Sequence, residues 1–312
     1  MRTSDSLRKT YGETLVELGR ENKQIVMLEA DLGNSTMSTL FWNAYPTRYF
    51  QMGIAEQNMA SVAAGLALAG KIPFINSFAV FASGRAYDQI RSSITIANLN
   101  VKICGSSAGL SDFGDGKTHQ SIDDIALMRV LPNMTVLSPC DAVETEQMVK
   151  AMVEHHGPMY IRINRNDLKV VTDPDEEYHI GKMRLMVEGS DVVVFATGVM
   201  VQKSMEAAAV LAAEGISTRV VNVSTIKPLD TQALIAFTRG VKGVVTAEEH
   251  SVIGGLGSAV AAALRRSRLP IEMVGIEDQY GTSAENYEIL LKHYGLESED
   301  VAQRVRSVLN EQ

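Results

Sequence analysis

Residues 53–70 read Gly-Ile-Ala-Glu-Gln-Asn-Met-Ala-Ser-Val-Ala-Ala-Gly-Leu-Ala-Leu-Ala-Gly, and this stretch indicates how the chain folds. Its many small residues predict a helix that another layer can approach closely. Glu56 falls in the first turn, where the helix dipole favours a carboxylate and the backbone holds it in place. We therefore expect Glu56 to carry the chemistry. The alternative is an ordinary acid at a helix N-terminus.

Short apolar runs alternate with helical patterns along the whole chain, which is typical of mostly parallel sheets flanked by helices. We predict an α/β protein with two domains, 1–170 and 189–312, joined by a polar, acidic linker at 171–188. The expected strands are 25–29, 72–75, 101–105, 134–138 and 159–163, then 191–196, 218–223, 242–247 and 271–276. The expected helices are 4–20, 56–69, 82–97, 121–130 and 141–155, then 200–214, 230–238, 255–265, 283–293 and 298–309.

Composition excludes several classes of protein. The chain has 312 residues, 21% of them charged, and a formal net charge of -8. This acidic balance argues against a nucleic-acid or anionic-membrane surface. No apolar run approaches the ~20 residues that a membrane span needs, and the N-terminus lacks a signal-peptide core, so we expect a cytoplasmic protein. Cys104 and Cys140 are far apart in sequence and are interpreted as buried hydrophobic residues of a reducing compartment.

Five segments, in one order along the chain, carry a family resemblance. After Gly-Ile-Ala-Glu-Gln at 53–57, the run 77–91 begins Ser-Phe-Ala-Val-Phe-Ala-Ser-Gly-Arg, and 113–120 reads Phe-Gly-Asp-Gly-Lys-Thr-His-Gln. Leu-Pro-Asn-Met-Thr-Val-Leu-Ser-Pro-Cys-Asp-Ala at 131–142 and Glu-Glu-His-Ser-Val-Ile-Gly-Gly-Leu-Gly at 248–257 continue the series. Together they resemble the transketolase family of thiamine diphosphate enzymes. The resemblance spans nearly the whole chain and implies a pyrimidine-binding domain followed by the family's C-terminal domain.

The resemblance implies a cofactor-binding role for several residues. Glu56 matches the catalytic carboxyl group that bonds to the aminopyrimidine ring of thiamine diphosphate, and Asp31 is a further expected cofactor contact. Phe78 and Phe81 match the aromatic slot for that ring, because ring faces suit a flat heterocycle. Their alternative is plain core packing. Arg85 and Asp88 lie one turn further on, paired within the helix or across an interface, and we assign them no catalytic role.

His119 is the second expected catalytic residue. It lies in a glycine-bearing loop, and loops on a rigid scaffold often carry catalytic groups. In the family, the matching histidine and the aspartate matching Asp115 contact hydroxyl and carbonyl oxygens of the sugar, so His119 is expected to relay protons. The alternative is a histidine that caps the helix expected to start near Ser121.

A phosphorylated substrate is implied by three further matches. Arg8 and Arg165 fall where the family carries phosphate-binding arginines, and the planar guanidinium suits phosphate. Ser35 matches the family's phosphate-binding serine. One position departs from the pattern: Ser107 stands where transketolases usually have another histidine. This departure puts the usual pentose and heptose phosphates in doubt and favours a related sugar phosphate.

The chain lacks the family's magnesium motif. Gly114-Asp115-Gly116 imitates the start of the Gly-Asp-Gly…Asn motif, but it lies inside the loop that ends at His119, so we assign no metal ligand. Full-length transketolases carry a diphosphate-binding domain ahead of such a segment, and the first helix is expected close to Met1. We therefore expect an N-terminal transketolase subunit to supply the diphosphate and Mg²⁺ site, in an α2β2 heterotetramer with a large apolar interface around Glu56 and Phe78.

The expected function is transfer of a two-carbon ketol unit from a ketose phosphate to an aldose acceptor. One alternative is the beta subunit of a 2-oxo-acid dehydrogenase, which shares the domain pair and the glutamate. Another is a non-catalytic assembly subunit of the same fold. Deoxyxylulose-phosphate synthase shares the motifs but is one long chain. The segment 248–250 is interpreted as a structural seam rather than a catalytic site.

Overall fold

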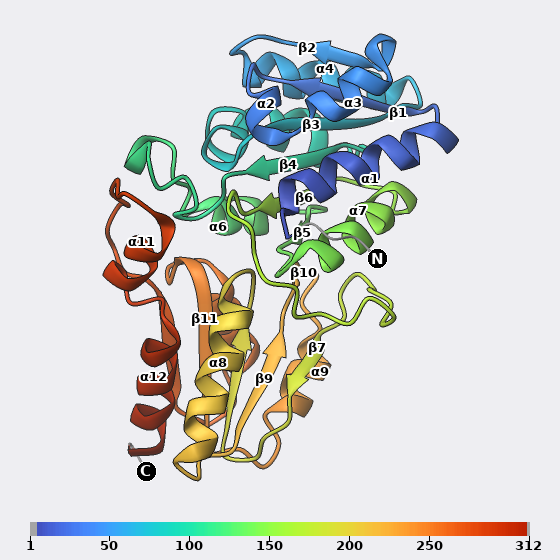
Figure 1. The fold of residues 1–312 in the computed structure, drawn as a ribbon. Helices are drawn as coiled ribbons and strands as arrows, with labels where there is room; N and C mark the ends of the chain where they lie inside the picture. The colour runs from blue at the N-terminus through green and yellow to red at the C-terminus, as the bar shows by residue number, and fades with distance from the viewer. Residues whose placement is uncertain (1–4, 311–312) are drawn as a thin grey trace.

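The computed structural model describes residues 5–310 and places two α/β domains one above the other (Figure 1). The first contains a seven-stranded sheet in the order β10-β5-β6-β4-β3-β1-β2, and the second a five-stranded sheet in the order β12-β11-β8-β9-β7. The predicted fold class is confirmed. Ser4, where the first predicted helix begins, lies outside the described residues. So do residues 1 and 312, at which the two predicted domains begin and end.

The first sheet is parallel except at one edge. Its strands are β1 (Ile25–Glu29), β2 (Tyr49–Gln51), β3 (Ile72–Phe78), β4 (Lys102–Ser106), β5 (Thr135–Leu137), β6 (Met159–Ile163) and β10 (Thr225–Lys227). Strand β10 pairs antiparallel with β5, and the other neighbours pair in parallel. Strands β1, β4 and β6 are buried along their whole length, which explains why they read as short continuous runs instead of alternating patterns.

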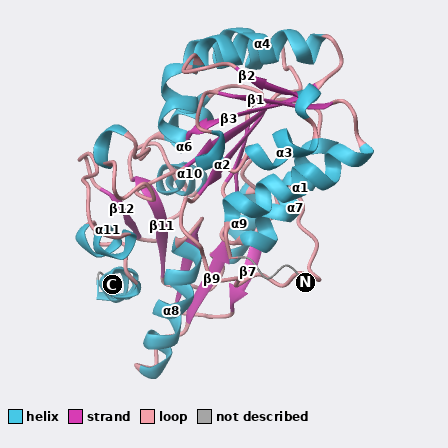
Figure 2. Ribbon diagram, turned by 45° about the horizontal axis from the view of Figure 1, so that its top comes forward, coloured by secondary structure: helices cyan, strands magenta, loops and turns pink. Residues whose placement is uncertain are grey.

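Helices cover both faces of this sheet. They are α1 (Leu7–Glu21), α2 (Gly33–Thr36), α3 (Thr39–Ala44), α4 (Glu56–Leu68), α5 (Tyr87–Gln89), α6 (Asp124–Val130) and α7 (Ala142–Glu154), with shorter turns η1 (Pro46–Arg48) and η4 (Gly116–Thr118). Ile25 and Met27 pack in the cluster with α1, α3 and α7, whereas Val26 and Leu28 pack with α4. Alternate residues of β1 thus reach opposite faces. Figure 2 shows α4 on one side of the strands and α1 and α3 on the other.

The second sheet is again mostly parallel. Its strands are β7 (Arg184–Val187), β8 (Val192–Ala196), β9 (Thr218–Asn222), β11 (Gly243–Ser251) and β12 (Ile271–Ile276). Its helices are α8 (Met200–Ala213), α9 (Thr231–Phe237), α10 (Leu256–Ala263), α11 (Tyr287–His293) and α12 (Ser298–Asn310). Helices α8 and α12 pack together beside β8 and β11, and the buried face of α12 consists of Val301, Ala302, Val305 and Val308.

Three features differ from the sequence expectations. Strand β7 lies within the predicted linker, 171–188, and pairs antiparallel with β9. Part of that linker therefore belongs to the second sheet. Strand β10 crosses from the C-terminal half into the first sheet. The expected helix 82–97 is broken into two π-helical segments, η2 (Phe81–Arg85) and η3 (Ile90–Thr95), on either side of the short α5.

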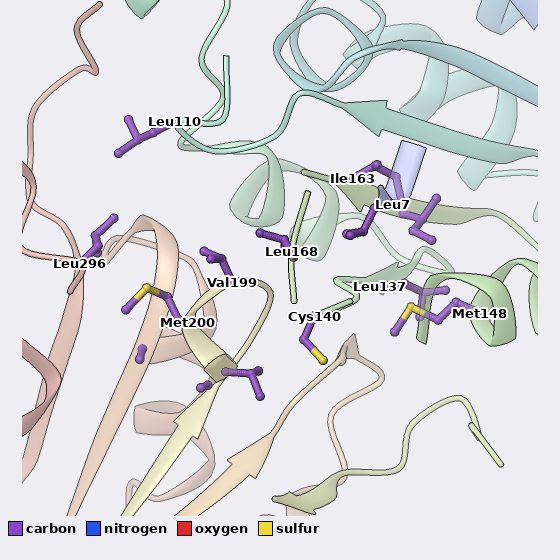
Figure 3. Packing of buried hydrophobic residues seen from close by; sticks show 14 of the residues in the cluster. Leu7, Leu110, Leu137, Cys140, Met148, Ile163, Leu168, Val199, Met200 and Leu296 are labelled. Atoms are coloured by element: carbon purple, nitrogen blue, oxygen red, sulfur yellow. The ribbon is translucent and has the colours of Figure 1, made fainter. Parts of the chain in front are cut away.

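The hydrophobic core is continuous between the domains. One cluster includes Leu7 and Ile163 of the first domain and Val199, Met200 and Leu296 of the second (Figure 3). Cys140 lies at this junction, and Cys104 lies within the first sheet. Both cysteines are free and buried, as the sequence predicted. The core therefore holds the two sheets as one packed body.

Candidate active site

The candidate site lies where the carboxyl ends of parallel strands meet, which is the usual ligand edge of such sheets. Asp31 follows β1, Phe78 ends β3, and Glu56 is the first residue of α4. A cavity of about 310 Å³ opens at this edge. It is lined by Ala30, Asp31, Leu32, Ile54, Glu56, Phe81, Arg85, Thr118 and His119. The structure thus brings four predicted site residues, Asp31, Glu56, Phe81 and His119, to one cavity.

Glu56 combines burial with an open side toward this cavity. It is only 4% exposed, and its Oε1 lies 3.1 Å from Nη1 of Arg85. No side chain caps the start of α4, and the position of Glu56 in the first turn favours its negative charge. The contact with Arg85 holds the carboxyl group in place. A bound ring that reaches this carboxyl group would therefore meet an acceptor whose position is already set.

The aromatic residues form a small cluster around His119. The rings of Phe78 and Phe81 are stacked, with centroids 6.1 Å apart and planes 15° apart. His119 meets both rings edge-on, at 6.2 Å from Phe78 and 5.4 Å from Phe81. Arg85 places its guanidinium carbon 4.2 Å from the Phe81 centroid. Phe81 therefore offers the cavity an apolar wall, while Phe78 is buried behind the lining residues.

His119 does not cap a helix. Its Nδ1 lies 2.9 Å from the hydroxyl oxygen of Thr118, and helix α6 begins only at Asp124. The N-cap of α6 is Asp123, which makes no side-chain capping bond. The imidazole thus has no structural role at the helix and faces the cavity.

Two arginines gather near the loop that carries His119. Arg165 pairs with Asp112 at 2.8 Å, and its guanidinium lies 5.7 Å from the Phe78 centroid. Arg8 donates from Nη1 to the carbonyl oxygen of Ser35 at 2.6 Å. Burial, then the nearby charge of Arg165, lowers the pKa of Arg8. The three residues predicted to bind phosphate, Arg8, Ser35 and Arg165, are thus brought together, although Ser35 contacts Arg8 through its backbone.

Asp112 connects this cationic pair to the loop histidine. Burial raises the pKa of its carboxyl group, Arg165 and His119 oppose that shift, and the neighbouring Asp115 reinforces it. Asp115 itself is exposed. Two guanidinium groups and two carboxyl groups therefore lie side by side at this edge of the cavity.

Glu29 shapes the loop that carries Asp31. Its Oε1 accepts hydrogen bonds from the amides of Ala30 and Leu32, each at 3.1 Å. Its Oε2 accepts from the hydroxyl groups of Thr36 at 2.9 Å and Ser38 at 2.6 Å. Burial raises the pKa of Glu29 to about 7 in spite of these bonds. A single buried carboxyl group thus organises the turn between β1 and α2.

Sequence reasoning missed Arg85, Asp112 and Glu29 as members of this site. Arg85 was given no catalytic role, yet it contacts Glu56 and lines the cavity. Its distance of one helical turn from Phe81 was the available signal. Ser107 is buried with φ at +54°, and its hydroxyl oxygen has no partner among residues 5–310; it does not line the cavity.

Neither a metal-binding cluster nor a membrane-spanning helix occurs in the described part of the chain. Between residues 5 and 310, no group of three or more His, Cys, Asp or Glu side chains is arranged to hold a metal ion. Within the same range, no helix combines the length and the apolar character that a membrane span needs. Glu248, Glu249 and His250 are buried, and Glu249 and His250 accept hydrogen bonds from the amides of Leu110 and Ala126 in the first domain.

Known proteins share this architecture. The family model "Transketolase, pyrimidine binding domain" matches residues 4–171, and "Transketolase, C-terminal domain" matches residues 181–301. A protein of Methanocaldococcus jannaschii, whose name describes a transketolase C-terminal section, is 43% identical, with 96% of this chain and 95% of the relative covered. A 6-deoxy-6-sulfo-D-fructose transketolase subunit of a Clostridium species is 40% identical, with 97% and 94% covered.

A solved structure agrees along almost the whole chain. This structure, a "Split gene transketolase, inactive beta4 tetramer", is 47% identical, with a TM-score of 0.88 and 98% of each chain covered. Together the two family models match most of the sequence. The first model covers six of the seven strands of the first sheet, and the second model covers the strands of the second sheet. The chain therefore belongs to the transketolase family and comprises its pyrimidine-binding and C-terminal domains.

Proposed function

We propose that this chain is the pyrimidine-side subunit of a thiamine diphosphate-dependent transketolase. The enzyme would transfer a two-carbon ketol unit from a ketose phosphate to an aldose acceptor. The observation that carries the proposal is the buried carboxyl group of Glu56, which lines a cavity of about 310 Å³ together with Phe81 and His119.

The residues present fit the pyrimidine end of the cofactor. Glu56 offers a fixed carboxyl group, Phe81 an apolar ring face, and Ile54 and Leu32 further apolar lining. When bound, thiamine diphosphate would supply the nucleophilic carbon for the ketol transfer. Glu56 would hold the proton shared with the pyrimidine nitrogen, and Asp31 would border the same ring. Burial excludes water from this bond and strengthens it.

His119 and the arginines would handle the sugar. The His119 imidazole would give or take a proton at the substrate's carbonyl and hydroxyl oxygens. Asp115 would accept from a sugar hydroxyl group, and Arg8 and Arg165 would bind the terminal phosphate. Because a named relative acts on a sulfonated fructose, a ketose with a sulfonate in place of phosphate belongs in the substrate panel.

A companion subunit would complete the site. The diphosphate and Mg²⁺ would be bound mainly by that partner, since the residues described here offer no metal-binding cluster. Exposed apolar side chains support this assembly: Ile54 at the cavity is 73% exposed, and Leu68 at the opposite end of α4 is 75% exposed. The names of relatives as a split-gene chain and a subunit support a partner chain and an oligomer, for which we propose an α2β2 arrangement. We propose a cytoplasmic location for it.

Co-expression with a companion chain that carries the diphosphate domain tests the proposal. The purified assembly is expected to transfer ketol units between sugar phosphates when supplied with thiamine diphosphate and Mg²⁺. Glu56→Gln should lower kcat by about 100-fold or more, because it removes the shared proton, while circular dichroism stays unchanged. Turnover of Glu56→Gln within a few-fold of wild type would refute the role of this residue.

The same assay separates the alternatives. A 2-oxo-acid dehydrogenase beta subunit would yield decarboxylation of a 2-oxo acid and no ketol transfer. A non-catalytic assembly subunit would give an assembly in which Glu56→Gln has no effect. Activity of the chain purified alone would contradict the need for a partner.

A further inference from the structure

The loop 109–120 carries the sugar-side residues Asp112, Asp115 and His119, and it lies against the C-terminal domain. Apart from the short turn η4, this loop has no regular structure of its own. Within the first domain the Gly109 amide donates to the carbonyl oxygen of Ser121 at 2.8 Å, and contacts with the C-terminal domain add to this closure. Figure 1 shows the loop, at the left of the molecule, approaching the segment that precedes α11.

The start of the loop is held by Glu249 of β11. The Oε1 atom of Glu249 accepts a hydrogen bond from the amide of Leu110 at 2.7 Å. Gly109, with φ at +65°, passes so close that a Cβ there would lie 2.4 Å from the carboxyl carbon of Glu249. The other oxygen, Oε2, accepts from Asn164 Nδ2 at 3.3 Å, next to Arg165 in sequence. One carboxyl group of the C-terminal domain thus contacts both the loop and the chain beside Arg165.

The middle and end of the loop are held by residues 281–284. The amide of Ala284 donates to the carbonyl oxygen of Phe113 at 2.9 Å. Gln120 donates from Nε2 to the carbonyl oxygens of Thr282 at 2.9 Å and of Asp112 at 3.2 Å. The loop is therefore fixed on both sides of Asp115 by the C-terminal domain.

We infer that Glu249 is a positioning residue for sugar binding, and that the C-terminal domain sets the geometry of the loop that carries His119 and Asp115. The inference rests on the proposed function, because the loop meets a sugar only in a transketolase. Its neighbour Glu248 provides a contrast: its carboxyl oxygens accept from the amides of Leu256 at 2.6 Å and Gly257 at 2.8 Å, within its own domain. Both glutamates are almost fully buried.

Hydrogen exchange of the full chain tests the inference without any activity. Glu249→Gln leaves a single side-chain oxygen, which cannot accept hydrogen bonds from both Leu110 and Asn164. The amide hydrogens of residues 109–120 are therefore expected to exchange with solvent about tenfold faster. Glu248→Gln should leave the loop unchanged and loosen only the start of α10. Loop protection that is the same in wild type and Glu249→Gln, or is lost equally in both variants, would overturn the inference.

Gln120→Met tests the second contact if Glu249→Gln does not fold. Methionine keeps the volume of this buried side chain and removes the amide that donates to Thr282. Faster exchange of 109–120 is again expected, by about tenfold. An unchanged loop in a folded Gln120→Met protein counts against the inference.

The assembled enzyme gives an independent readout. Glu249→Gln should raise KM for the ketose phosphate by about tenfold and leave the affinity for thiamine diphosphate within about twofold, whereas Glu248→Gln should change neither. An equal loss of sugar and cofactor affinity would indicate general loosening and overturn a positioning role. A wild-type assembly with no ketol transfer would refute the proposed function and leave the exchange result standing.

Discussion

Glu56 and Arg85 form an ion pair with one buried and one half-exposed partner. Glu56 is 4% exposed and Arg85 is 52% exposed by side chain, with 3.1 Å between the charged atoms. Solvent weakens the attraction on the arginine side, so the pair should contribute modestly to stability. Removing Arg85 would leave the buried carboxyl group of Glu56 without this charged partner.

A double-mutant cycle measures this pair. Arg85→Met, Glu56→Gln and the double variant should give a coupling energy of about 0.5–1 kcal/mol in the unfolding of the isolated chain. Arg85→Met keeps an apolar stem over Phe81, so the ring contact is largely retained. Chemical denaturation of the four proteins provides the energies, and a coupling indistinguishable from zero would mean that the contact is adventitious.

Glu29 should make stability depend on pH. Burial raises its pKa from 4.5 to about 7, so the folded state favours the protonated acid. Its contribution to stability is complete below pH 4.5 and is lost as the pH rises through 7. Between pH 5 and pH 8 the wild type should therefore lose about 2 kcal/mol relative to Glu29→Gln.

Urea denaturation of both proteins at several pH values checks this dependence. Nearby groups do not titrate in the same window, because the pKa of Tyr49 is raised to about 12 and that of Cys104 is raised further by burial. A difference between the two proteins that stays constant with pH would show that Glu29 keeps an ordinary pKa in the fold.

At the scale of elements, the strongly patterned segments could be predicted, as could the three-residue β5 within the run 134–138, whereas β2 and β10 could not. The strand predicted at 25–29 matches β1, and the helix predicted at 298–309 nearly matches α12, because apolar runs and helical periodicity leave clear signals. Strands β2 and β10 have only three residues each, too few to show a period. Their pairing is decided by segments distant in sequence, which a local pattern does not record.

Part of the candidate site could likewise be predicted from the sequence. Glu56, His119 and Phe81 stand in motifs with a recognisable order, and the fold places them on one cavity. The one-turn spacing of Arg85 from Phe81 was visible, but spacing alone does not show that its guanidinium reaches Glu56. Asp112 contacts Arg165 across the fold, and Glu29 binds the turn that follows β1. Neither contact follows a recognisable sequence motif.

Helix α4 should tolerate bulk on one side only. Ala63 is fully buried between the helix and the sheet, whereas a Cβ at Gly65 would meet nothing within 4 Å. Ala63→Leu should therefore destabilise the isolated chain by about 1–3 kcal/mol, and the matched variant Gly65→Ala should stabilise it by about 0.5–1 kcal/mol. Thermal unfolding checks both signs, and stabilisation by Ala63→Leu would contradict the close packing of α4.

At the scale of the whole molecule, the exposed side of α4 is expected to contact the companion subunit. Gly65→Arg should leave the isolated chain folded, since nothing lies near that position, but should block co-purification with the companion. The matched control is Ala209→Arg, at an exposed small residue of helix α8 in the C-terminal domain. Light scattering of the mixtures reports the assembly, and a Gly65→Arg heterotetramer of normal size would place the interface elsewhere.

Strand β10 also determines how this protein can be divided. It lies in the C-terminal half of the chain, yet it hydrogen-bonds to β5 and closes one border of the first sheet. A fragment ending near residue 170 would leave β5 as an uncovered edge, and bare edges recruit other strands. Domain-wise expression of this protein should therefore yield aggregates from the N-terminal piece, and a protease nick in the connecting segment should leave both pieces bound to each other.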